Sequence, residues 1–188
     1  MISEAVLDVF NNTQDFLRRS DFNGLYAWML EHLNDYPINT TGELTTELLR
    51  LCRKQLEDNL VGIPDYFLYN TNRRFYEIPK GVHSIGSKAF SGCNFTGLVI
   101  PSNVTVIQSL ACSYMPELEE VLIEEGCTII GSEAFLSNYN LKEVTIPKSV
   151  DLIEQNVFNE CPNVTLLVHR GSHAERYARR NGLRYELL

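Results

Sequence analysis

The sequence has no apolar run close to the roughly 18 residues that a membrane-spanning helix needs. Its first ten residues, MISEAVLDVF, contain acidic side chains where a secretory signal peptide would be basic. The net charge is −8, and acidic residues outnumber basic ones in both 1–74 and 75–188. Nucleic-acid binding needs clustered Lys and Arg to contact phosphates. We therefore expect a cytoplasmic protein without nucleic-acid or membrane partners.

The sequence also lacks the motifs of common enzymes and metal sites. It has no nucleophile elbow and no phosphate-binding Gly loop. His169 and His173 are four residues apart, but Gly171 and Ser172 predict a turn between them, so we do not expect the two imidazoles to share a helix face. We predict no catalytic residue, no cofactor site and no metal site. The chain is expected not to be an enzyme.

What the sequence does contain is a block of about 23 residues that recurs from Phe75 onward. Two apolar positions, seven residues apart, mark each block. The first is Ile78, Ile100, Ile123, Ile146 and then Val168; the second is Ile85, Ile107, Ile130 and Ile153. Because one such block cannot bury its apolar side chains alone, the pattern predicts a stacked array with a continuous core.

Each block reads as a short strand, a corner, a second short extended stretch and a compact turn. Pro79, Pro101 and Pro147 stand at the corner, where a missing backbone donor is tolerated because strand pairing ends there.

The cysteines also follow the repeat. Cys112 and Cys127 occupy positions where neighbouring blocks have Phe and Val, so we predict reduced core residues. The five cysteines are Cys52, Cys93, Cys112, Cys127 and Cys161, an odd number that does not suggest a disulfide framework.

The blocks IPKGVHSIGSKAFSGC, LEEVLIEEGCTIIGSEAFLSNYN and LKEVTIPKSVDLIEQNVFNEC resemble the leucine-rich repeats of the BspA type. The tail VTLLVHRGSHAERYARRNGLRYELL, residues 164–188, resembles the terminal cap of that family. The resemblance implies a solenoid over 75–188, ending in a Gly-Ser turn, a helix and a last strand. The second block departs from the family pattern at Gln108, Ser109 and Cys112, and we expect a locally different shape there.

Residues 1–74 lack the repeat and show apolar residues at helical spacing. The spacing predicts three helices that end near Gly62-Ile63-Pro64. They form either a separate small helical module or a cap over the first block of the array. The predicted fold class is therefore α+β, with an N-terminal helical module followed by a leucine-rich-repeat solenoid.

A repeat array favours binding over catalysis, and the side chains between the inward columns are the candidates for contact. Successive strand residues point to opposite faces, so residues next to the inward isoleucines should point outward. An alternative for Val106, Ile129 and Leu152 is that bends at the corners turn them inward as extra core, and an inward orientation is also an alternative for Val99 and Leu122. The predicted protein-binding residues are Val99, Glu120, Leu122, Glu143, Thr145, Val106, Ile129 and Leu152.

Charge gives a second candidate surface. Acidic residues crowd one block and basic residues crowd the cap, which could steer a partner or simply be solvated. The two groups are Glu117, Glu119, Glu120, Glu124 and Glu125, and Arg170, Arg176, Arg179, Arg180 and Arg184. We predict a non-enzymatic module that binds a protein partner. The alternatives are a phage-type inhibitor or decoy of a host protein, and a structural subunit of a homo-oligomer.

Overall fold

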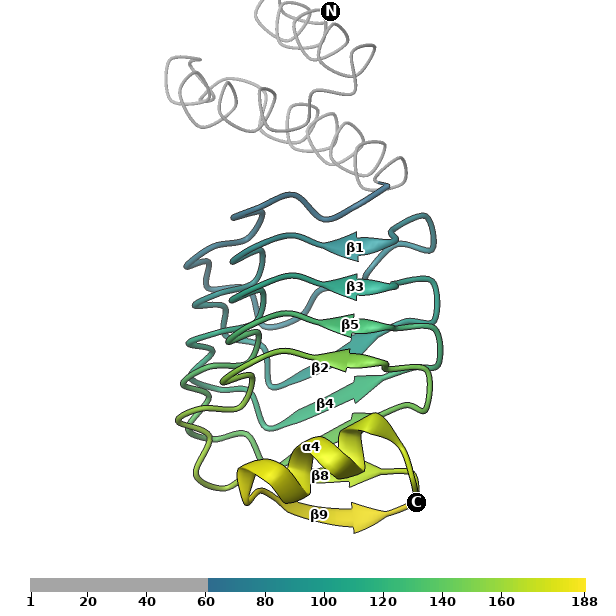
Figure 1. Ribbon diagram of the computed structural model, residues 1–188. Helices are drawn as coiled ribbons and strands as arrows, with labels where there is room; N and C mark the ends of the chain where they lie inside the picture. Colours follow the sequence, from purple (N-terminus) through teal and green to yellow (C-terminus); the bar gives the residue numbers. More distant parts are fainter. Residues whose placement is uncertain (1–60) are drawn as a thin grey trace, which may run out of the picture. The chain divides into compact units, whose positions relative to one another are not determined.

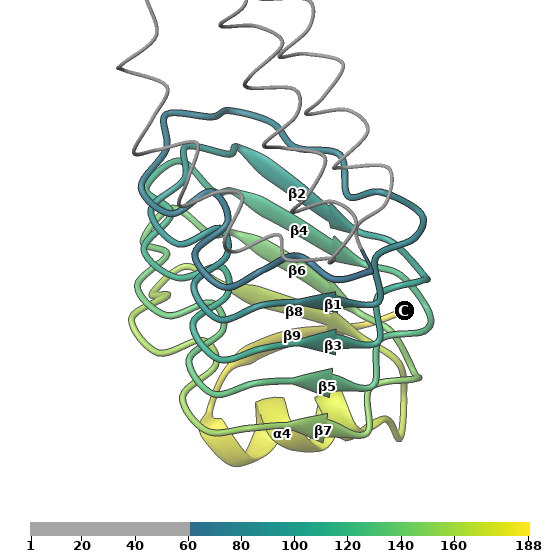
Figure 2. The same cartoon turned by 90° about the horizontal axis from the view of Figure 1, so that it is seen from above.

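Residues 61–188 are described by the computed structural model, and they form a β-solenoid with two parallel sheets (Figure 1). The four-stranded sheet pairs β1 (Ser84–Ile85), β3 (Val106–Ile107), β5 (Ile129–Ile130) and β7 (Leu152–Ile153) in that order. The five-stranded sheet pairs β2 (Gly97–Ile100), β4 (Glu120–Ile123), β6 (Glu143–Ile146), β8 (Thr165–Val168) and β9 (Arg184–Leu187). The two sheets are separate layers, and Figure 2 shows their strands from a second side, with β2 at the top of the view and β7 at the bottom.

The core lies between these layers and is formed by the repeated apolar columns. In β2 and β4 the residues alternate between exposed and buried, as expected for strands with one face on the core. Register confirms the predicted columns, because Ile100 pairs with Ile123 and Ile107 pairs with Ile130. All members of both predicted series are buried: Ile78, Ile100, Ile123, Ile146 and Val168, and Ile85, Ile107, Ile130 and Ile153.

The turns stack through backbone hydrogen bonds to the next turn. Phe90 N–H donates to Ala111 O at 2.8 Å, and Cys112 N–H donates to Ala134 O at 2.8 Å. Each turn contains two left-handed residues, four positions apart, and only one of these residues is glycine. The pairs are Tyr66 and Asn70, Lys88 and Gly92, Leu110 and Tyr114, Glu133 and Ser137, and Asn156 and Glu160. The stacking therefore holds a conformation that non-glycine residues adopt at a cost.

The second block keeps the backbone of its neighbours, so the predicted local difference is confined to side chains. Cys112 stands where adjacent turns have Phe90 and Phe135, and all three are fully buried. Three residues later, Met115 stands where Cys93 stands one turn earlier, and it too is fully buried. A small residue and a large one have exchanged places within one turn. Core volume is nearly conserved by such an exchange, which explains why the backbone does not change.

The array begins earlier than Phe75. Ile63 N–H donates to Ser84 O at 2.8 Å, and Ile63 O accepts from Gly86 N–H at 2.8 Å, which forms a parallel bridge to β1. Leu68 N–H donates to Ala89 O at 2.7 Å, in the pattern of the later turns. Residues 61–74 thus form a further turn of the solenoid. The three predicted helices fall almost entirely within residues 1–60, outside the described part of the chain.

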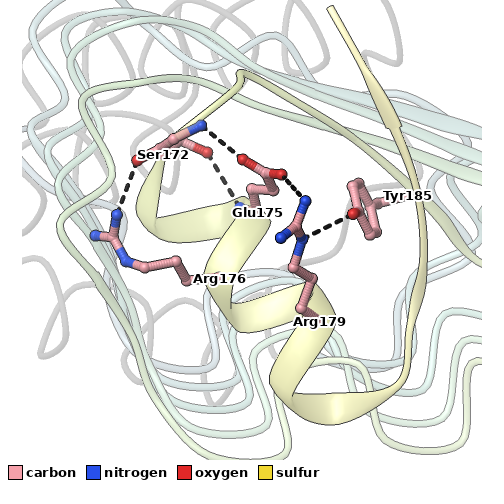
Figure 3. Close-up of polar contacts among 6 residues, drawn as sticks. Ser172, Glu175, Arg176, Arg179 and Tyr185 are labelled. Atoms are coloured by element: carbon pink, nitrogen blue, oxygen red, sulfur yellow. Dashed lines mark hydrogen bonds and ion pairs between the residues drawn. The ribbon is translucent and has the colours of Figure 1, made fainter.

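The C-terminal cap consists of α4 (His173–Asn181) followed by β9, as the resemblance implied. The Ser172 side chain accepts a hydrogen bond from Glu175 N–H at 3.1 Å, and Gly182 ends the helix at φ 65°. The buried Glu175 carboxylate accepts from Gly171 N–H at 2.6 Å and pairs with Arg179 at 2.7 Å. Arg179 also donates from Nε to Tyr185 Oη at 2.8 Å, which ties α4 to β9 (Figure 3). In the span 61–188 no helix is long and apolar enough to cross a membrane.

Candidate protein-binding face

The outward side chains of the five-stranded sheet form the first candidate surface. Strand register places Val99 beside Leu122 and Leu122 beside Thr145. Glu120 lies beside Glu143 in a parallel row. Val99 is 52% exposed and Leu122 is 42% exposed, while Thr145 is half-buried. These five residues, called the β2–β6 face below, therefore form two adjacent rows, one largely apolar and one acidic.

Two exposed residues at the same repeat phase, one turn before β2, were missed by the sequence interpretation. Phe75 and Glu77 stand at the repeat phase of Gly97 and Val99, and Phe75 is 71% exposed. The signal was available, because Ile78 fixes the phase and Phe75 precedes it by three residues. Gly97 leaves this part of the surface open, since a Cβ there would meet only Glu120 O at 3.9 Å.

The carboxylates on the β2–β6 face differ from other acidic groups in how they are used. Within residues 61–188, Glu120 and Glu143 make no hydrogen bond or ion pair through their side chains, and the same holds for Glu77. A partnerless surface carboxylate keeps its full hydration and can pair with an incoming cation. These acids are therefore available to a partner.

The neighbouring acids serve the solenoid itself. Glu124 accepts from Ser102 N–H at 3.0 Å, and Glu119 pairs with Lys142 at 2.7 Å. Glu125 accepts from the backbone N–H groups of Lys148 and Ser149 at 3.0 and 3.1 Å. The bond from Lys148 N–H is the main reason why the pKa of Glu125 is lowered. Of the predicted acidic cluster, three members thus link one turn to the next.

The arginines of the cap are also largely engaged in local contacts. Arg176 donates to Gly171 O at 2.8 Å, and Arg184 donates to Pro162 O at 3.0 Å. Arg179 pairs with Glu175 and contacts Tyr185, as described for the cap. Many of the acidic and basic residues behind the predicted charge contrast therefore make contacts within the solenoid and its cap.

The outer side of the four-stranded sheet is a second, separate apolar row. Register pairs Val106 with Ile129 and Ile129 with Leu152. Val106 and Ile129 are half-buried, and Leu152 is 43% exposed. The adjacent isoleucines fill the core, so these three residues do not turn inward as the alternative supposed. Two outer faces on different sheets thus carry the eight predicted residues.

Histidine and cysteine form no reactive cluster in the part of the chain that the structure describes. His169 follows β8 and His173 begins α4, and no group of three or more His, Cys, Asp or Glu residues in 61–188 could hold a metal ion. Cys93, Cys112, Cys127 and Cys161 are free and buried, as predicted, while Cys52 lies outside the described residues. Burial raises the pKa of the Cys127 and Cys161 thiols to about 11.

The repeats of this chain match a known protein family. The family model described as the BspA type leucine rich repeat region matches residues 55–174 with six copies. A leucine-rich repeat protein from Bacteroides capillosus is 38% identical, with TM-score 0.41, over 45% of this chain and 63% of that one. A leucine rich cell surface protein from Faecalibacterium prausnitzii is 23% identical, with TM-score 0.42, over 57% of this chain and 35% of that one. The chain thus spans less than two thirds of either structure, and no curated protein matches it. Its repeats, their core columns and the family match together show that the chain belongs to the BspA-type leucine-rich-repeat family.

Proposed function

We propose that this protein binds a protein partner through the β2–β6 face and has no catalytic role. Leucine-rich repeats generally mediate contacts with other proteins or adhesion to surfaces, which supports a binding function. The observation that carries the choice of face is the row of exposed Val99 and Leu122 beside the partnerless carboxylates of Glu120 and Glu143. Exposed apolar residues rimmed by charge are typical of contact surfaces.

The chemistry of the face defines the expected partner. Val99 and Leu122 would contact an apolar side chain, and exclusion of water there would supply most of the affinity. Glu120 and Glu143 would pair with Lys or Arg at the rim and would mainly increase the association rate. The partner surface should therefore combine an apolar centre with basic residues. The buried, unpaired thiols of the four cysteines in 61–188 fit the cytoplasmic setting that the sequence favours.

The test compares two leucines with almost the same exposure on different sheets. Leu122 is 42% exposed and Leu152 is 43% exposed. Leu122→Glu and Leu152→Glu should each change the free energy of unfolding by no more than about 0.5 kcal/mol, because both side chains reach solvent. Ile123→Glu is the destructive control, since it would bury a carboxylate that has no partner.

The readout is capture of the partner from an extract of the native host by the full-length tagged protein. Leu122→Glu should lose the partner, whereas Leu152→Glu should retain it. Glu120→Lys should weaken capture, and the difference from the unsubstituted protein should shrink at high salt. Loss with Leu152→Glu alone would move the site to the four-stranded sheet. Retention by both variants would reject both faces.

A further inference from the structure

β9 is the last strand of the five-stranded sheet, and one of its edges is unpaired. It pairs in parallel with β8, and no strand within 61–188 pairs with its other side. In Figure 2 α4 lies beside β7, and in Figure 1 β9 lies at the end of the stack of strands. Unpaired edges are templates for pairing with another chain.

The hydrogen bonds to β8 determine which backbone groups of β9 remain available. Leu188 N–H donates to Val168 O at 2.9 Å, and Val168 lies opposite Leu187. Because backbone N–H groups alternate in direction along a strand, those of Tyr185 and Leu187 point away from β8. The same register directs Arg184 and Glu186 outward, in the rows of Thr165 and Leu167, and directs Tyr185 and Leu187 toward the inner side.

The sequence of this edge is symmetric in its chemistry. Leu183-Arg184-Tyr185-Glu186-Leu187 reads apolar, basic, aromatic, acidic, apolar, so its reversal exchanges the two charges and restores the apolar ends. We propose that the free edge of β9 pairs in antiparallel fashion with β9 of a second copy of this chain, with Tyr185 facing Tyr185 of the partner subunit.

Charge selects this register among those that the backbone permits. The available N–H groups allow Tyr185 to face Tyr185, Tyr185 to face Leu187, or Leu187 to face Leu187 of the second copy. The first places Arg184 opposite Glu186 of the partner subunit, twice by symmetry. The second places Glu186 opposite Glu186 of the partner subunit, and the third places Glu186 opposite Leu188 of the partner subunit. Opposite charges across strands stabilise a pair, and like charges destabilise it.

Exposure of the last apolar residues points to the same occupant. Leu187 belongs to the inner column of Ile100 and Ile123 but is 41% exposed, whereas those two are at most 1% exposed. In the proposed register Leu183 of the partner subunit lies beside Leu187 and would cover it. Glu186 has no side-chain partner in the described part of the chain, and Arg184 has donors beyond the one that contacts Pro162 O.

The interface is small, because each copy contributes one short strand. Standard protein interfaces bury about 1,600 Å², and an edge of five residues provides far less. The dimer should therefore be weak, with a Kd on the order of 10 μM or higher. A two-fold axis perpendicular to the sheet would place both β2–β6 faces on the same side of the dimer.

The test is sedimentation equilibrium of the full-length protein over a range of concentrations. We expect a reversible monomer–dimer equilibrium. Arg184→Glu and Glu186→Arg each place two like-charge pairs in the interface and should raise the Kd at least tenfold. The double variant exchanges the charges and should restore the Kd to within about threefold of the original. Arg180→Glu is the matched control, because Arg180 is an exposed residue of α4 outside β9, and it should leave the Kd unchanged.

Three results would overturn the proposal. The protein could remain monomeric at all concentrations, which would leave the edge to a different occupant or to none. A dimer that ignores both single substitutions would use another surface. If the single variants weaken the dimer and the double variant does not restore it, the substitutions act through the hydrogen bond from Arg184 to Pro162 O rather than across the interface. If charge reversal disturbs β9, Arg184→Gln and Glu186→Gln remove the attraction without adding repulsion. Leu122→Glu should leave dimerization intact, which keeps this test separate from that of the β2–β6 face.

Discussion

Asn138 provides the sharpest test of how the turns are held together. Its side chain is fully buried and satisfies three backbone groups. Nδ2 donates to Cys112 O and to Phe135 O, both at 2.9 Å, and Oδ1 accepts from Met115 N–H at 2.8 Å. One amide thereby connects two consecutive turns.

Replacing Asn138 with Ala removes all three bonds at once. Each bond contributes about 1 kcal/mol to stability, and a buried group left without a partner costs about 1–3 kcal/mol more. We therefore expect Asn138→Ala to lower the free energy of unfolding by about 4–6 kcal/mol. Asn140→Ala is the matched control two residues away, because the exposed Asn140 makes one bond, to Pro116 O at 2.7 Å. It should cost at most about 1 kcal/mol.

The free energy of unfolding is measured by urea titration of the full-length variants. The values can be compared directly if the free energy falls with urea concentration at the same slope in each variant. Asn138→Cys is a second probe, since Cys161 stands at the same repeat position and its thiol donates to Phe135 O at 3.1 Å. This variant should be more stable than Asn138→Ala, because the thiol can reach Cys112 O. If Asn138→Ala and Asn140→Ala had equal effects, the buried amide would not hold the turns together.

Three further predictions concern charge, thiols and the backbone. The Ser132 hydroxyl and N–H both donate to the Glu154 carboxylate, and these bonds lower the pKa of Glu154. Their contribution to stability is complete above the unfolded pKa of about 4.3 and is lost as pH falls through the lower folded pKa. Glu154→Gln should therefore lose less stability than the unsubstituted protein between pH 6 and pH 3 in acid unfolding. A Cys52→Ser variant should show no thiol that reacts with a disulfide reagent before unfolding, because the four remaining thiols are buried; rapid native labelling would contradict this burial. Leu110→Asn should stabilise the protein by about 0.5–1 kcal/mol, since Asn tolerates the left-handed conformation better, and Asn156→Leu at the matching position should destabilise it similarly in thermal melts; two changes of the same sign would refute the argument.

The core of the solenoid could be predicted from sequence because it depends on a single repeated spacing. Ile123 and Ile130 were assigned to the interior by phase alone, and both are buried. The shape of the second block could not be predicted, because the loss of Phe at Cys112 is compensated by Met115 in a different column. A pattern read one column at a time misses this exchange. The early start of the array at Ile63 was missed because the surrounding residues lack the full repeat.

The candidate face was predicted only in part. Alternation along the strands placed Val99 and Leu122 outward, and both are exposed. The sequence could not distinguish Glu120 from Glu124, although they have different surroundings. Glu124 accepts from Ser102 N–H one turn earlier, whereas the Glu120 side chain makes no hydrogen bond or ion pair in 61–188. The sequence does not show which of the two carboxylates lies within hydrogen-bonding distance of the neighbouring turn.

The parallel register of the five-stranded sheet also bears on positional specificity. Its backbone repeats at every strand, about 4.8 Å apart, so a ligand could in principle shift by one strand and meet the same main-chain geometry. The side chains prevent this equivalence. From β2 to β9 one outward row reads Gly97, Glu120, Glu143, Thr165 and Arg184, and the other reads Val99, Leu122, Thr145, Leu167 and Glu186. Each step from one strand to the next thus changes polarity or charge in at least one of the two rows, and a ligand matched to one strand would be mismatched on the next. Because the backbone is regular and the surface side chains are not, a ligand can distinguish each strand of the sheet from its neighbours.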